Sequence, residues 1–172
     1  MKRKWFLAIT IFTLVLVLAG CGKSVEEQID TGVASAQTVF EENPQKPNQT
    51  LDKIELFVPS GYTVEQSEDK NNLLLKKGNE NYILFVNINE DEDSNLHYEI
   101  LKNNKSKQIV KEQTVKLDGA FGFTAVVEHG EGQFELVVSS GGVKMTTISE
   151  DKNIDVKLVD MMQIVRSVNI LD

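Results

Sequence analysis

Few side chains in this sequence are suited to chemistry, and they fall into three groups. The chain has a single cysteine, Cys21, and two histidines, His97 and His129. A third group is an alternating series of amide and acidic side chains between residues 87 and 95. A thiol can act as a nucleophile or an acylation site, an imidazole as a base or metal ligand, and clustered oxygens as a calcium site.

The two histidines lack the neighbours that catalysis or zinc binding requires. Neither His97 nor His129 lies at a spacing such as His-x-x-x-His, and the sequence contains no Gly-x-Ser-x-Gly nucleophile motif. We therefore expect both histidines to lie on the surface, and we expect the chain not to be an enzyme.

The alternating segment could bring oxygen ligands to a cation. It consists of Asn87, Asn89, Asp91, Asp93 and Asn95. An EF-hand loop starting at Asn89 would need Gly at its sixth position and Glu at its twelfth, where this chain has Ser94 and Ile100. A solvated acidic loop is the favoured interpretation, with calcium binding as the alternative, and we expect no resident metal or cofactor.

The residues before Cys21 predict export. Met1–Lys4 is basic, and Trp5–Ala19 carries no charge and is shorter than the roughly 20 residues that span a bilayer as a helix. The run ends with Leu18, Ala19, Gly20 and Cys21. We therefore expect residues 1–20 to be a signal peptide.

Residues 18–21 resemble the lipobox of bacterial prolipoproteins: an aliphatic residue, two small residues and then cysteine. The resemblance implies that Cys21 receives a diacylglyceryl group and that a peptidase cuts before it. It further implies fatty acyl groups such as palmitate on the new N-terminus, and a protein tethered to the outer, extracytoplasmic face of the cell membrane. The alternatives are an uncleaved anchor or an ordinary signal peptide.

Charge and composition exclude some partners. The chain has 172 residues, 41% of them hydrophobic, which is enough for one core, and its formal net charge is −8. Removing residues 1–20 removes three basic side chains and brings the charge to −11. Such a surface repels phosphate, so we expect no nucleic-acid partner, and charge cannot hold the protein to an anionic membrane.

Residues 21–52 are predicted to form a lipidated N-terminus and a stalk. Ser24 and Glu27 form a capping-box pattern, and a thin apolar stripe at helical spacing follows. Residues 43–50 contain Pro44 and Pro47 among polar residues, a composition typical of a linker. A stalk is favoured over a helix whose stripe docks a partner or the domain itself.

Residues 53–172 are predicted to form the domain. Alternating apolar residues indicate N-terminal hairpins and then four strands joined by tight turns, an antiparallel meander. A helix whose apolar residues run from Leu158 to Val168, with Asn153 or Asp155 as its N-cap, would cover the buried face. The expected strands and helices are residues 54–58, 62–66, 72–77, 82–89, 96–104 (a helix), 108–117, 121–127, 134–138, 143–149 and the C-terminal helix.

The predicted fold class is α+β, an antiparallel sheet covered by helices. The Pro-x-Gly-Tyr sequence of Pro59–Tyr62, the order of elements and the Ile-Val-Arg-Ser sequence of Ile164–Ser167 together resemble the PsbP-like sandwich, over residues 51–172. That family is mostly non-catalytic and acts through protein partners.

These observations lead to one functional expectation and one alternative. We expect a membrane-anchored lipoprotein that serves as a non-catalytic binding or accessory module for a cell-envelope protein, through an exposed apolar patch. The alternative is a lipoprotein receptor for a small ligand or cation, with a pocket of convergent polar groups.

Overall fold

The computed structural model describes residues 22–171 of the chain. The lipobox residues Leu18, Ala19, Gly20 and Cys21, and the signal peptide before them, lie outside the described residues. The elements, in chain order, are α2 (Val25–Glu41), β1 (Gln49–Leu51), β2 (Ile54–Leu56), β3 (Tyr62–Gln66), β4 (Asn72–Lys77), β5 (Glu80–Val86), α3 (Leu96–Asn103), β6 (Ile109–Leu117), β7 (Ala120–Glu128), β8 (Gln133–Ser140), β9 (Val143–Glu150), α4 (Ile154–Ser167) and β10 (Asn169–Ile170).

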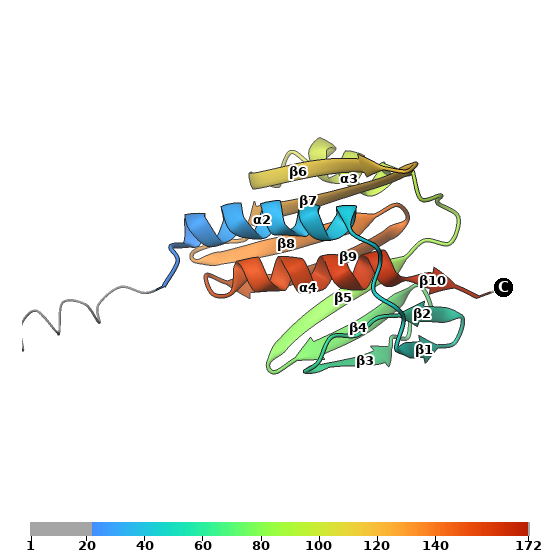
Figure 1. The fold of residues 1–172 in the computed structure, drawn as a ribbon. Coiled ribbons are helices and arrows are strands. Elements are labelled where there is room, and N and C mark those ends of the chain that lie inside the picture. The colour runs from blue at the N-terminus through green and yellow to red at the C-terminus, as the bar shows by residue number, and fades with distance from the viewer. Residues whose placement is uncertain (1–21, 172) are drawn as a thin grey trace, which may run out of the picture.

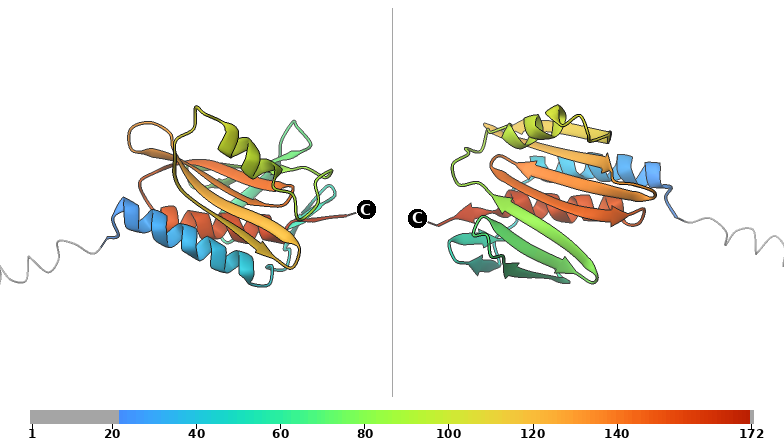
Figure 2. Two further views of the ribbon diagram at one scale, coloured as in Figure 1. Left: turned by 90° about the horizontal axis from the view of Figure 1, so that it is seen from above. Right: turned by 180° about the vertical axis from the view of Figure 1, so that it is seen from behind.

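A seven-stranded antiparallel sheet is the centre of the fold, in the order β3-β4-β5-β9-β8-β7-β6. Its C-terminal part is the meander β6 to β9, as the alternating residues predicted, and β5 pairs with β9 to add the N-terminal hairpins. Helices α2 and α4 lie side by side over one face, and α3 lies on the other (Figures 1 and 2). The α+β class expected from the sequence is confirmed.

The main core lies between the sheet and the helix pair. Alternation places one set of side chains from each strand, such as Leu84 of β5 and Met145 of β9, in this core, where both are fully buried. Helix α4 contributes Leu158, Met161 and Val165 from one face. Each large apolar side chain buried in this way stabilises the domain by about 1.5–3 kcal/mol.

The predicted stalk is wrong for residues 25–41, because α2 packs on the domain. Ile29, Val33 and Phe40 on its apolar stripe are buried, and α2 contacts α4, β6 and β7. The alternative of a stripe that docks on the domain itself is therefore correct. Ser24 caps α2 as expected, since its Oγ accepts a hydrogen bond from the Glu27 N–H at 3.1 Å.

The proline-containing segment also belongs to the domain. The Asn48 side chain donates to the Val58 carbonyl at 3.0 Å and accepts from the Val58 N–H at 2.8 Å. The domain therefore does not begin near residue 53, as the sequence suggested. It begins with the first turn of α2.

A small three-stranded sheet, β1-β2-β10, joins the N-terminal and C-terminal parts of the domain. Strand β2 pairs with β1 on one side and with β10 on the other. Next to it, the Phe57 N–H donates to Ser167 Oγ at 2.8 Å. Ser167 ends the Ile-Val-Arg-Ser sequence, so that motif fixes the end of α4 against the small sheet.

The N-cap of α4 differs from the expectation in one detail. Asn153 occupies the position, but it adopts a left-handed conformation with φ of 56° and its side chain makes no capping hydrogen bond. The Ile154 N–H instead donates to Gln28 Oε1 of α2 at 3.2 Å. One helix thus satisfies the first turn of the other, a second reason why α2 is part of the domain.

Candidate functional site

The outer face of the sheet is only partly covered, and this is the first candidate site. Helix α3 covers the β6–β7 side, where Tyr98 packs against Phe121 and Phe123 at ring-centroid distances of 6.0 and 5.4 Å. Figure 2 (right) shows α3 over that side, while β5 and β9 have no helix over them in the described part of the chain. Alternation along these strands therefore exposes side chains that a covered sheet would bury.

One cross-strand row runs from the open half to the covered half. Leu74 pairs with Ile83, Ile83 with Thr146, and Thr146 with Val137. Val137 is buried beneath α3, whereas the Ile83 side chain is 51% exposed. The apolar row thus continues past the edge of its helical cover into solvent.

A groove of about 730 Å³ follows this open half, and we call it the outer groove. Ile148 of β9 extends the apolar strip and is 43% exposed. The lining contains carboxylates but no lysine or arginine. The outer groove is formed by Leu74, Asn79, Glu80, Asn81, Ile83, Gln133, Glu135, Thr146, Thr147, Ile148 and Glu150.

Glu80 at the rim of this groove belongs to a polar network that reaches into the core. It forms an ion pair with the buried Lys157 and accepts a hydrogen bond from the Tyr82 hydroxyl at 2.7 Å. Lys157 also donates to Ser149 Oγ at 2.7 Å. Burial opposes ionisation of Glu80, but the hydrogen bonds from Lys157 and Tyr82 outweigh it and lower the pKa of Glu80. The pKa of Tyr82 is raised by burial and by its hydrogen bond to Glu80.

The second candidate is a smaller cavity of about 270 Å³ at the end of α4, which we call the distal pocket. It brings together the acidic loop and the Ile-Val-Arg-Ser motif, which are far apart in the sequence, and adds the Gly141–Gly142 turn between β8 and β9. The distal pocket is lined by Asn87, Glu90, Glu92, Ser140, Gly142, Val143, Val165, Arg166, Val168, Asn169 and Ile170.

Arg166 is a candidate site residue that the sequence analysis did not single out. Its guanidinium lies 4.3 Å from the ring centroid of Phe40, and its buried Nε has no hydrogen-bond acceptor among the described residues. Burial lowers its pKa, partly offset by Glu92. The only signal in the sequence was a basic residue in the last turn of an otherwise apolar helix face.

The acidic loop is held by its own backbone and short side chains. The Asn87 N–H donates to the Gly142 carbonyl at 3.0 Å, and Asn87 Oδ1 accepts from the Asn89 N–H at 3.1 Å. A Cβ on Gly142 would lie 2.5 Å from the Asn87 carbonyl oxygen, so glycine is required for this close approach. Within residues 22–171, no three histidine, cysteine or acidic side chains are arranged to hold a metal ion.

The surface prediction for His97 is wrong, and that for His129 is confirmed. His129 is exposed in the β7–β8 turn. His97 is only 6% exposed, with its ring edge against Phe85, and its Nε2 lies 3.2 Å from the Gly142 carbonyl. Since a carbonyl can only accept, Nε2 carries the hydrogen, and burial lowers the pKa of this imidazole.

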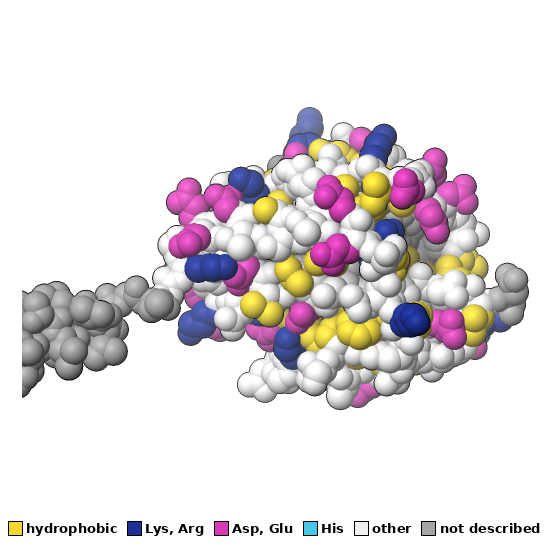
Figure 3. Space-filling view, viewed as in Figure 1, with side chains coloured by type: hydrophobic (Ala, Val, Ile, Leu, Met, Phe, Trp, Pro, Cys, Tyr) yellow, Lys and Arg dark blue, Asp and Glu magenta, His cyan; other side chains and the backbone are white. Residues whose placement is uncertain are grey.

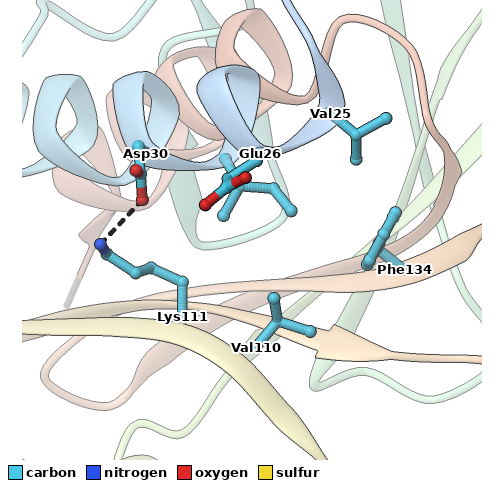
Figure 4. A pocket seen from close by; sticks show the side chains of 7 residues that line it. Val25, Glu26, Asp30, Val110, Lys111 and Phe134 are labelled. Atoms are coloured by element: carbon cyan, nitrogen blue, oxygen red, sulfur yellow. Dashed lines mark ion pairs between the residues drawn. The ribbon is translucent and has the colours of Figure 1, made fainter.

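The third candidate is an apolar groove of about 500 Å³ under the first turns of α2, which we call the proximal groove. It lies between α2, the start of β6 and the start of β8 (Figure 4). An ion pair of 2.7 Å between Lys111 and Asp30 closes one side. The groove is lined by Val25, Glu26, Ile29, Asp30, Val110, Lys111 and Phe134.

The helix face shows no surface of a single charge. Figure 3 shows acidic and basic side chains interspersed over α2 and α4, with apolar atoms in small groups between them. None of the described helices is long and apolar enough to cross a membrane.

Comparison with known proteins finds likenesses among solved structures but none among sequences. No protein-family model matches the sequence, and no curated protein matches it. The structure is similar to the solution structure of cyanobacterial PsbP (CyanoP) from Synechocystis sp. PCC 6803, at 13% sequence identity and a TM-score of 0.47. The match covers 73% of this chain and 91% of that one.

Proposed function

We propose that this chain is a lipoprotein anchored through Cys21 to the extracytoplasmic face of the cell membrane, and that it is a non-catalytic binding module for a cell-envelope protein. The observation that carries the binding role is the outer groove, where Ile83 and Ile148 remain exposed on an otherwise packed sheet. Exposed apolar strips with a polar rim mark interaction surfaces in soluble domains.

The charge of the outer groove defines the partner's chemistry. Glu80, Glu135 and Glu150 line it without a basic residue, although Lys157 and Lys107 pair with the first two from outside. The surface therefore suits a protein segment with one or two aliphatic side chains flanked by lysine or arginine. Its modest size favours a transient complex over a permanent one.

The binding role can be tested with two isoleucines of equal exposure. Ile148 in the outer groove and Ile170 at the distal pocket are both 43% exposed. A photo-cross-linking residue at each position of the full-length protein, expressed in cells, should capture a partner with a basic surface from position 148 only. Ile148→Asp should abolish that complex, and Ile170→Asp should leave it intact.

The opposite pattern would contradict the outer groove as the binding surface. Capture from position 170 alone, with Ile148→Asp harmless, would assign recognition to the distal pocket. Capture from neither position, with the protein correctly localised, would contradict a protein partner at either surface.

The anchor has its own test. Mass spectrometry of the native N-terminal peptide should show Cys21 as the first residue, carrying diacylglycerol. Cys21→Ser should abolish both the lipid and the cut before residue 21, so that the longer precursor accumulates. An unmodified N-terminus at another residue would contradict the lipoprotein assignment.

A receptor for a small ligand is the second candidate function, and Arg166 is the observation in its favour. Its buried Nε has no acceptor among the described residues, and Glu90 and Glu92 line the same pocket. A small ligand with both a carboxylate and an amine would match these charges. Calorimetric titration with free amino acids should detect binding to wild type but not to Arg166→Gln, and a flat titration of wild type would count against this role.

A further inference from the structure

The first residues after Cys21 are fixed to the domain. Lys23 Nζ lies 2.6 Å from Asp155 Oδ2 at the start of α4. The Lys23 carbonyl accepts a hydrogen bond from the Gln28 side chain at 3.1 Å. Burial opposes ionisation of Asp155, yet the hydrogen bond from Lys23 prevails and lowers its pKa. Contacts with the folded domain therefore extend two residues before α2, to Lys23.

The tether to the membrane is consequently very short. Only Gly22 separates Cys21 from Lys23. Because consecutive Cα atoms are about 3.8 Å apart, the Lys23 Cα can lie no more than roughly 7.6 Å from the Cα of Cys21. A domain on so short a tether cannot stand away from the bilayer that holds its lipid.

The end of the domain nearest Cys21 also carries the proximal groove. Val25 is in the first turn of α2 and Val110 is next to the first residue of β6, and both line this groove (Figure 4). Val110 is 47% exposed although it is aliphatic. An exposed apolar side chain beside the anchor can enter the boundary between lipid headgroups and acyl chains.

Charge does not explain how this end would meet a lipid surface. Lys23 and Lys111 are each paired with an aspartate, and Glu26 of α2 lines the groove. The groove end thus has both signs of charge and little net attraction for anionic headgroups. The covalent tether and the exposed apolar side chains are therefore the contacts that would orient the domain on the membrane.

We propose that the domain lies with its α2-start end on the bilayer, with Val110 and the mouth of the proximal groove in contact with the lipid surface. This rests on the proposed lipidation of Cys21. Of the possible occupants of the groove, the lipid surface is the one that the short tether brings to it. The distal pocket, at the other end of α2, then faces away from the membrane.

A single-tryptophan experiment tests this orientation. The only tryptophan in the sequence is Trp5, which is removed with the signal peptide, so a tryptophan introduced elsewhere reports alone. Val110→Trp is the probe. Ile88→Trp is the matched control, since Ile88 is another aliphatic residue, 66% exposed, in the acidic loop that contacts the far end of the sheet. Each mature, lipidated variant, beginning at Cys21, would be reconstituted into phosphatidylcholine vesicles containing acyl chains brominated near the carbonyl.

We expect brominated lipid to quench Val110→Trp several-fold more than Ile88→Trp and to shift its emission to the blue. Equal quenching of both probes, or none, in protein that floats with the vesicles would overturn the orientation while leaving the anchor intact. Protein that does not float would refute the lipid anchor and the orientation together.

A second probe covers the case in which tryptophan perturbs β6. Because the sulfur of Cys21 is consumed by lipid, Val110→Cys would provide the only free thiol for a nitroxide label. The label should be more accessible to oxygen in the bilayer than to a water-soluble nickel complex, and the reverse ratio would refute the contact.

Discussion

At the scale of single residues, most buried polar side chains of this domain have hydrogen-bond or ion-pair partners and stabilise the fold. Lys157 is buried among core residues and is neutralised by Glu80, with Ser149 as a second partner. His97 is buried with a hydrogen bond to a backbone carbonyl. Two buried atoms among the described residues are exceptions, because Arg166 Nε and Glu112 Oε2 have no hydrogen-bond partner there.

The Glu80–Lys157 pair gives a stability prediction. Glu80→Gln should destabilise the fold by about 1–3 kcal/mol, because it leaves a buried ammonium without its counter-charge. The cost stays below that of a fully buried pair because Glu80 is partly exposed. Glu65→Gln is the control, since its pair with Lys76 is exposed and should be worth less than about 1 kcal/mol. Urea unfolding of both variants measures the difference, and equal effects would contradict the role of the network.

His97 predicts a pH dependence of stability. Its folded-state pKa is lowered by burial, and Lys144 adds to this while the Gly142 hydrogen bond and Glu90 oppose it. The unfolded state therefore binds the proton more readily, so stability should fall as pH drops through the ordinary histidine pKa of about 6.5. His97→Gln keeps a donor but cannot titrate, and should flatten the curve between about pH 7 and pH 5.5. His129→Gln, at an exposed site, is the control for the substitution itself.

At the scale of elements, helix α2 is the part whose role changes most once the fold is known. It lies against α4 along its length, and its Gln28 satisfies the first turn of α4. At its other end Phe40 fills the space above Gly122 of β7. Helix α2, which the sequence suggested was a spacer, therefore encloses one side of the core.

A substitution at Gly122 would test the packing of α2 against β7. A Cβ at this position would lie 2.2 Å from a carbon of the Phe40 ring, so Gly122→Ala should destabilise the domain by about 1–3 kcal/mol through overpacking. Phe40→Leu, which removes the ring, should recover part of the loss when combined with Gly122→Ala. Purely additive effects of the two substitutions in urea unfolding would contradict the contact between α2 and β7.

The strands show what the sequence could predict. The ranges 62–66 and 72–77 were predicted to the residue, because alternation and turn glycines are local signals. Strands β1 and β10 were missed because they are only three and two residues long and become strands by pairing with β2. Helix α2 was taken for a stalk because Gly32 and Ala36 make its stripe narrow, although their small size is what allows close packing.

The candidate sites were harder to predict than the fold. The acidic loop and Ile164–Ser167 are far apart in the sequence, and only the fold places them around one pocket. His97 was predicted to lie on the surface because no metal-ligand or nucleophile motif accompanies it, and its contacts with Phe85 and Gly142 are visible only in the fold. The outer groove depends on where α3 stops along the sheet, which no local pattern records.

At the scale of the whole molecule, the domain has two different ends. One carries the start of α2, the anchored Lys23 and the proximal groove. The other carries the acidic loop, the small sheet and the distal pocket (Figure 1). On the proposed anchoring, the first end meets lipid and the second meets the aqueous compartment.

This arrangement predicts how the protein responds to salt. With a mature net charge of −11 and both signs at the lipid-proximal end, the anchor would be hydrophobic and covalent. Washing membranes at about 1 M salt, where electrostatic attraction is screened within roughly 3 Å, should release none of the protein. The outer groove complex should weaken under the same conditions, since its rim is acidic. Release of the protein itself by salt would contradict the lipid anchor.

The fixed position of Lys23 has a consequence for biosynthesis. On the proposed lipidation, a membrane enzyme must reach the Cys21 sulfur, and a peptidase must then reach the bond before it. Once Lys23 has paired with Asp155 and the first turn of α2 has packed, the folded domain lies close to the peptide bond before Cys21 and hinders access to it. Maturation must therefore come before this corner of the domain closes, so a precursor that folds too soon after translocation would be processed slowly.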